Sequence, residues 1–165
     1  MNKTLQTLSL AVLLTGDLSL NTFGMNFRKD TDEVLLARMI FGEARSCSLT
    51  EQIAIGYTAV NRATDGKNWN GTTLKDAILK KRQYSCFNSN DPNLPKLSCP
   101  EKYGPKSFER CLWIARNILD RKFDDPTLGA THYHTKKTRA DWEDSPKMVK
   151  LYVPDFYEHF FFKEI

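Results

Sequence analysis

Two amphipathic helices with well-marked starts, separated by only a few residues, most constrain how this chain can fold. The first is predicted to begin after Asp30, an N-cap residue with Glu33 three positions on, and its apolar face extends to Phe41. The second begins with the same capping pattern at Ser48 and Glu51, followed by apolar residues at helical spacing. The chain is therefore predicted to place two buried helices in close succession.

A single carboxylate, that of Glu43, lies at the junction between these helices. The helix macrodipole favours cations at this end, so Arg45 suits the position better than Glu43 does. One interpretation is that Glu43 is solvated and pairs with Arg45, and residues 41–45 alone favour it. The other is a partly buried carboxyl beside Phe41 that keeps a proton near neutral pH, as the acid of a glycosidase does.

Further motifs follow in a fixed order. They are Asn61-Arg62 at the end of the second helix, Gln83-Tyr84-Ser85-Cys86-Phe87 after a third helix, residues 125–134, then Trp142 and His159-Phe160-Phe161. Together with Phe41-Gly42-Glu43-Ala44-Arg45, this set resembles the SleB/CwlJ-type cell-wall hydrolase family, which includes spore cortex-lytic enzymes and related phage endolysins. The resemblance extends from Val34 to Phe161.

The resemblance implies a compact, mainly helical α+β domain of the lysozyme and lytic-transglycosylase type, with a small β-sheet, over residues 25–165. It also implies cleavage of peptidoglycan between N-acetylmuramic acid and N-acetylglucosamine, with Glu43 as the catalytic acid. SleB-like members are lytic transglycosylases, in which the C6 hydroxyl of muramic acid attacks C1 and leaves a 1,6-anhydro end.

A transglycosylase of this kind needs one carboxylate, whereas retaining and inverting hydrolases normally need two. Hydrolysis by a muramidase with a water nucleophile is the alternative reaction, and Asp125 or Asp141 would then supply the second carboxylate. A catalytically weak glycan-binding protein is the alternative from a different class.

Polar and aromatic side chains near the motifs are candidates for glycan binding, because sugar rings pack on flat apolar rings and amides can fix acetamide groups. The candidates are Asn61, Gln83, Tyr84, Phe87, Thr131, His132, Tyr133, His134 and Trp142. Residues 131–134 are predicted to form a strand that lines the cleft. In the competing interpretation the aromatic rings belong to the core, Asn61 caps its helix, and one of the two histidines faces the core while the other faces water.

The histidines and cysteines suggest two further features. His132, His134 and His159 could bind zinc as in an amidase. No Cys pair or His-Glu-x-x-His pattern accompanies them and the resemblance implies no metal, so neither a metal nor another cofactor is expected.

The chain has four cysteines, Cys47, Cys86, Cys99 and Cys111, a number compatible with two disulfides. Three pairings are possible, and the sequence does not choose among them. For Cys86 and Cys111 a buried reduced thiol is favoured.

The length of 165 residues and the hydrophobic content of 41% suit a single core. Residues 1–24 contain Lys3 and a leucine-rich run, which predicts either a signal peptide or an N-terminal helix. Membrane contact is expected only through this segment, if it is retained. The expected location is the periplasm or cell wall, reached by export, or by release from the host cytoplasm at lysis for a phage lysin.

The net charge of +4 includes basic clusters at residues 80–82 and 136–139. Such clusters are attracted to an anionic cell wall. No nucleic-acid-binding motif accompanies them. The charge does not decide between partners, and a solvated face is the default interpretation of each cluster. The resemblance implies peptidoglycan glycan strands as the partner, nucleic acid is not expected, and the chain is expected to be a monomer.

Overall fold

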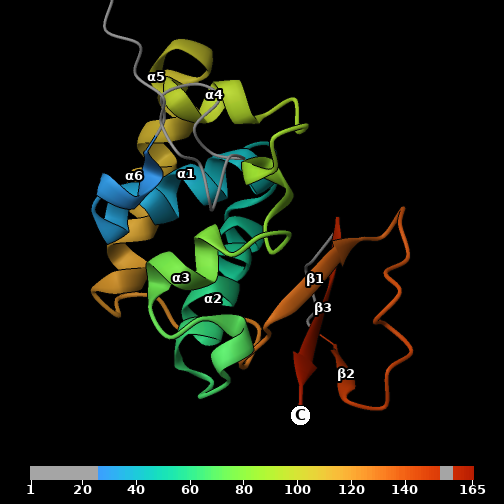
Figure 1. The fold of residues 1–165 in the computed structure, drawn as a ribbon. Helices are drawn as coiled ribbons and strands as arrows, with labels where there is room; N and C mark the ends of the chain where they lie inside the picture. The colour runs from blue at the N-terminus through green and yellow to red at the C-terminus, as the bar shows by residue number, and fades with distance from the viewer. Residues whose placement is uncertain (1–25, 153–157) are drawn as a thin grey trace, which may run out of the picture.

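A computed structural model of the chain describes residues 26–152 and 158–165. Its helices are η1 (Phe27–Lys29), α1 (Asp32–Ala44), α2 (Leu49–Thr64), η2 (Asn68–Asn70), α3 (Leu74–Leu79), η3 (Ser85–Phe87), α4 (Leu94–Ser98), α5 (Pro100–Tyr103) and α6 (Pro105–Leu119), and its strands are β1 (His132–Thr135), β2 (Met148–Leu151) and β3 (His159–Glu164). The helices gather on one side and the sheet stands beside them (Figure 1). The predicted mainly helical α+β class is confirmed, whereas the interpretation of residues 1–24 falls outside the described residues.

Of the two predicted N-cap residues, the structure confirms one and corrects the other. Ser48 caps α2 as predicted, since its hydroxyl accepts from the backbone N–H of Glu51 at 3.2 Å. At α1 the predicted cap was wrong by one residue, because Thr31 accepts from the N–H of Val34 at 3.3 Å. The carboxylate of Asp30 is instead engaged by Arg38 at 2.9 Å. Asp30 therefore makes a tertiary ion pair, and the adjacent Thr31 caps the helix.

Helix α2 is longer than the sequence pattern predicted. It continues beyond Asn61-Arg62 to Thr64, with Asp65 as its C-cap. Gly66 follows with a φ of +76°, a left-handed conformation that suits glycine and stops the helix. Asn61 therefore lies inside the last turns of the helix and does not cap it.

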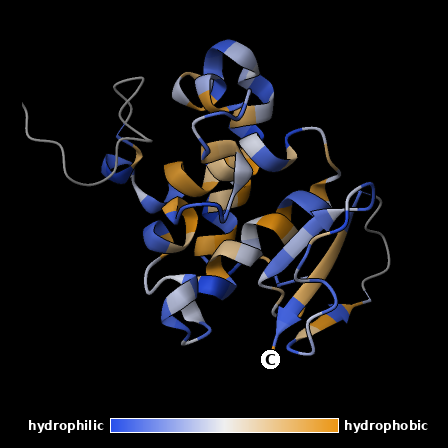
Figure 2. Cartoon of the chain, turned by 45° about the vertical axis from the view of Figure 1, so that its right-hand side comes forward, coloured by the Kyte–Doolittle hydropathy of each residue, from blue (hydrophilic) through white to orange (hydrophobic). Residues whose placement is uncertain are grey.

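Helix α1 forms the centre of the core. It packs against α2, α3, α4 and α6, and its side chains from Leu35 to Ala37 and from Met39 to Phe41 have no exposed surface. The ring of Phe41 meets that of Phe108 on α6 edge to face, with 5.8 Å between centroids. Hydrophobic residues gather along the helices where they face one another (Figure 2). None of the helices in the described part of the chain combines the length and the apolar character needed to cross a bilayer.

The three strands form an antiparallel sheet in the order β1-β3-β2. Tyr133 on β1 lies opposite Phe161 on β3, and His134 lies opposite Phe160. Since side chains alternate between the two faces of a strand, Tyr133, His159 and Phe161 share one face. His132, His134 and Phe162 share the other. This alternation decides which predicted site residues can meet Glu43.

Candidate active site

Glu43 lies in the last turn of α1, half-buried, with both carboxylate oxygens bound by other segments. Its Oε1 accepts from the backbone N–H of Cys86 at 2.8 Å and from the hydroxyl of Ser85 at 3.2 Å. Its Oε2 accepts from the hydroxyl of Tyr133 at 2.8 Å. The end of α1, the short helix η3 and strand β1 therefore converge on one carboxyl group.

Arg45 is engaged elsewhere. Its guanidinium donates to the carbonyl of Phe41 at 3.3 Å and to the side chain of Asn93 at 3.0 Å. It also lies over the ring of Phe41, 5.4 Å from the centroid. The simple surface pair of Glu43 with Arg45, which residues 41–45 alone favoured, is not what the structure shows.

Gly42 allows η3 to approach α1 this closely. A Cβ atom at position 42 would lie 2.6 Å from the Cβ of Cys86 and 2.7 Å from its sulfur, distances that packed atoms do not adopt. The missing side chain therefore lets Cys86 lie against the helix, with its backbone N–H directed at Glu43. Burial, and then the charge of Glu43, raises the pKa of the Cys86 thiol well above its usual range, so this thiol stays neutral.

Tyr133 is held by aromatic rings on the helix-facing side of the sheet. Its ring centroid lies 5.5 Å from that of His159, 5.9 Å from Phe161 and 6.4 Å from Tyr84. Burial, followed by the charge of Glu43, raises the pKa of Tyr133 well above its usual range, so the phenol keeps its proton. A phenol can both donate and accept, and the Tyr133 hydroxyl can therefore stay bonded to Glu43 with or without a proton on the carboxyl.

Two predicted glycan-binding rings belong to the core instead. Tyr84 is 1% exposed and Phe87 is 6% exposed. The hydroxyl of Tyr84 lies 3.0 Å from that of Thr58, and the ring of Phe87 packs edge to face on Phe27. Neither ring has a free face for a sugar, so their assignment as binding platforms is corrected. Gln83, just before them, is half-buried.

His132, His134 and Trp142 form a cluster on the far face of β1 from Tyr133. The ring centroids of the two histidines lie 5.1 and 5.7 Å from that of Trp142, and Phe162 packs against this tryptophan at 5.2 Å. Both histidines are half-buried, so they do not divide between core and water as the competing interpretation had it. His159 is on the opposite face, and the zinc arrangement considered for the three histidines therefore does not form.

Asn61 positions the loop that leads into β1. Its amide donates to Asp125 and to the carbonyl of Ala130, both at 2.9 Å. The Asp125 carboxylate also accepts from Thr127, through both its backbone N–H and its hydroxyl, and from the backbone N–H of Gly129. Asp125 thus organises residues 125–130 from within, and Asn61 fixes this loop to α2.

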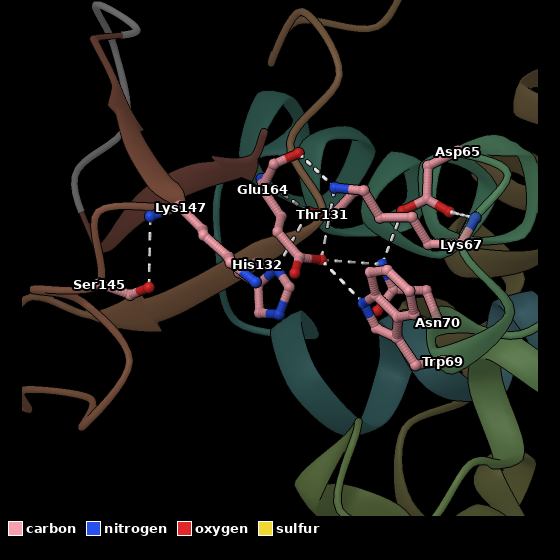
Figure 3. Close-up of polar contacts among 9 residues, drawn as sticks. All are labelled: Asp65, Lys67, Trp69, Asn70, Thr131, His132, Ser145, Lys147 and Glu164. Carbon is pink, nitrogen blue, oxygen red and sulfur yellow. Dashed lines mark hydrogen bonds and ion pairs between the residues drawn. The ribbon is translucent and has the colours of Figure 1, made fainter.

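A hollow of about 300 Å³ opens beside this loop, with Asn61 and Thr131 among its lining residues. On its wall, the carboxylate of Glu164 lies 3.5 Å from the Lys67 ammonium and accepts from the indole of Trp69 at 3.1 Å (Figure 3). The indole is 59% exposed. Trp69 is not among the residues predicted for the site, because residues 69 and 164 are brought together only by the fold.

His132 makes the stability of the fold depend on pH. Burial, and then the charge of Arg62, lowers the pKa of His132 to about 4 from 6.5. Between these values the unfolded chain binds a proton that the folded chain does not, so stability decreases as the pH falls through this window. We expect the melting temperature of the wild type to decrease from pH 6.5 to 4 more than that of His132→Gln. Thermal unfolding of both proteins across this range tests it, and equal decreases in the two would contradict it.

All four cysteines are free thiols in the structure. Cys86 and Cys111 are buried, as the reduced alternative predicted, whereas Cys47 is half-buried and Cys99 is exposed. Burial raises the pKa of Cys47 to about 11 and that of Cys111 to about 12. Neither thiol is therefore activated as a nucleophile.

In this mainly helical domain, one firmly held carboxyl, that of Glu43, lies between the end of a helix and a strand. The sequence profile of the Cell Wall Hydrolase family matches residues 47–162, well over half of the chain, and the chain belongs to this family. Comparisons with curated proteins and with solved structures gave no match. The suspected SleB-type resemblance is thus confirmed, and the chain is a hydrolase that degrades cell-wall peptidoglycan.

Proposed function

We propose that this protein is a lytic transglycosylase that cleaves glycan strands between N-acetylmuramic acid and N-acetylglucosamine, with Glu43 as its only catalytic carboxyl. The observation that carries the proposal is the convergence of three donors on Glu43 from η3 and β1. Glu43 precedes the matched residues 47–162, so its role is argued from this geometry. We also propose that the protein acts at the cell wall, reached by export or by host lysis.

The proposed reaction uses Glu43 twice. In its protonated form it donates to the bridging glycosidic oxygen as the bond to C1 breaks. The resulting carboxylate then takes the proton of the muramic acid C6 hydroxyl while that oxygen bonds to C1, which returns Glu43 to its starting state. No water is consumed. The donors from Tyr133, Ser85 and Cys86 keep the carboxyl in one orientation through both transfers.

The muramidase alternative needs a second carboxylate that positions water. Asp125 accepts four hydrogen bonds from Asn61, Thr127 and Gly129, and serves its own loop. Asp141 is exposed and precedes Trp142, which packs on the face of β1 away from Tyr133. Neither aspartate is a suitable base, so the arrangement favours transglycosylation.

Digestion of purified peptidoglycan, followed by mass spectrometry of the released muropeptides, tests the proposal. We expect anhydro-muramic ends, lighter than reducing ends by one water, and no product from the Glu43→Gln variant. Reducing ends would show attack by water, and free stem peptides would show an amidase. Absence of products together with sedimentation on the wall would show a glycan-binding protein. Each of these three outcomes would overturn the proposal.

The Tyr133 hydroxyl is expected to support turnover without contributing to substrate affinity. Tyr133→Phe keeps the packed ring and removes one of the three donors to Glu43. Without this donor the carboxyl is held by Cys86 and Ser85 alone and is less firmly oriented, so kcat should fall about 10- to 100-fold while KM stays unchanged. Clearing of suspended cell walls measures both constants. Tyr103→Phe, at an exposed tyrosine, is the matched control, and an unchanged kcat in Tyr133→Phe would contradict the role.

A further inference from the structure

A second group of chemically reactive side chains lies where α2 meets β3. Cys47 precedes α2, Glu51 lies in its first turn, and His159 begins β3. The Cys47 sulfur, a Glu51 carboxylate oxygen and a His159 ring nitrogen all lie within 4.8 Å of one another. Glu51 and His159 are 1% and 5% exposed, so this is a buried cluster with one half-buried member, Cys47.

The spacing of the cluster suits a tetrahedral metal ion. The Oε1 of Glu51 and the Nδ1 of His159 are 3.3 Å apart. Two such ligands at about 2.0–2.1 Å from a tetrahedral zinc ion would be separated by about 3.3 Å. A sulfur at about 2.3 Å from the same ion would lie about 3.5 Å from each of them. The Cys47 sulfur is within 4.8 Å, so a small rotation of its side chain would complete the set.

The surroundings already orient two of the three ligands. The backbone N–H groups of Glu158 and His159 donate to the Oε1 of Glu51 at 2.8 and 3.0 Å, so an ion that binds this oxygen displaces one of the two donors while the other keeps the carboxylate in place. The ring of His159 packs edge to face on that of Tyr133. Outer contacts of this kind fix the direction of metal ligands and are part of metal sites.

Charge balance supports the same interpretation. A carboxylate as buried as that of Glu51 costs free energy unless an opposite charge neutralises it. A zinc ion bound by one thiolate, one carboxylate and one neutral imidazole gives a site of zero net charge. Thiolate, imidazole and carboxylate are also ligands that zinc accepts together.

We propose that Cys47, Glu51 and His159 bind a zinc ion. Binding displaces the thiol proton of Cys47, and a water molecule entering from the half-buried side of this residue completes the tetrahedron. The ion joins the start of α2 to the start of β3 and so holds the sheet against the helices. It takes no part in the reaction proposed for Glu43, and the site is independent of that proposal.

Cobalt titration of the reduced protein tests the site directly, because thiolate-bound cobalt gives a charge-transfer absorption in the near ultraviolet. We expect saturation at one equivalent, reversal by zinc, and a higher melting temperature with zinc. Cys47→Ser should abolish the absorption and the shift in melting temperature, whereas Cys99→Ser, at an exposed thiol, should retain both. This Cys47 variant changes one half-buried atom and is expected to fold.

Metal binding can be tested separately from catalysis, because the Glu43→Gln variant should bind cobalt as the wild type does. Failure to saturate, or a charge-transfer band that persists in Cys47→Ser, would overturn the zinc site. If the cluster only pairs Glu51 with His159, zinc will leave the melting temperature unchanged. That result would also overturn the zinc site.

Discussion

Replacing Glu43 by Gln is expected to lower peptidoglycan turnover by about 1,000-fold or more, in line with the size of general acid–base effects. The amide has the shape of the carboxyl and can still accept from Cys86 and Ser85 through its oxygen, while its nitrogen donates to the Tyr133 hydroxyl. The packing of the site is therefore preserved and only the transferable proton is lost. Clearing of purified cell walls measures the rate, and thermal unfolding checks the fold.

The matched control is Glu33→Gln, which changes another glutamate of α1. Glu33 pairs with Arg116 near the surface, a kind of interaction that contributes little to stability. This variant should retain wild-type turnover. A Glu43→Gln enzyme within about tenfold of the wild type, a smaller loss than general acid–base catalysis would give, would remove Glu43 from the mechanism.

Gly42→Ala is expected to damage both the stability and the activity. The new methyl group would lie 2.6 Å from the Cβ of Cys86 and 3.0 Å from a methyl of Leu97, and overpacking of this kind costs about 1–3 kcal/mol. Because a Cβ is attached to the backbone, Cys86 can yield only by moving its N–H away from Glu43. We expect the melting temperature to fall by about 3–10 °C and turnover to fall by about 10- to 100-fold.

A second helical glycine separates these two effects. In Gly56→Ala the new methyl meets the Cδ1 of Ile118 at 2.5 Å and the Cδ1 of Ile40 at 3.1 Å. Both are ends of flexible side chains that can move aside, whereas the gain of about 1 kcal/mol in helix propensity is common to both variants. This variant should lose less stability than Gly42→Ala and keep its turnover. Equal activity in the two variants would show that the approach of Cys86 to α1 does not matter for catalysis.

Local sequence patterns predicted the parts of the fold that depend on neighbouring residues. The capping pattern at Ser48 correctly placed the start of α2, and the apolar spacing correctly predicted α1, although this helix extends past Phe41 and includes Glu43 in its last turn. The strand over residues 131–134 was also predicted to within one residue of β1. Periodicity could locate these elements because each is specified by its own side chains.

The outcomes that sequence could not predict depend on contacts between distant residues. An alternating strand shows that Tyr133 and its two neighbouring histidines face opposite ways, but not which face meets Glu43. The burial of Tyr84 results from its packing beneath β1 and beside Thr58. The sequence could not identify the Ser85 hydroxyl and the Cys86 backbone N–H as donors to Glu43, because hydroxyl and peptide N–H groups occur throughout any chain. The cluster of Cys47 and Glu51 with His159 likewise exists only after β3 reaches α2.

The most direct test of the central claim, that Glu43 alone catalyses attack by the substrate's own C6 hydroxyl, is digestion of peptidoglycan in water labelled with oxygen-18. Mass spectrometry of freshly released muropeptides then reports where the oxygen at C1 came from. The account predicts 1,6-anhydro ends without label, and none from the Glu43→Gln variant. Reducing ends that carry the heavy oxygen would contradict it, because they would show water as the nucleophile and require a second carboxylate.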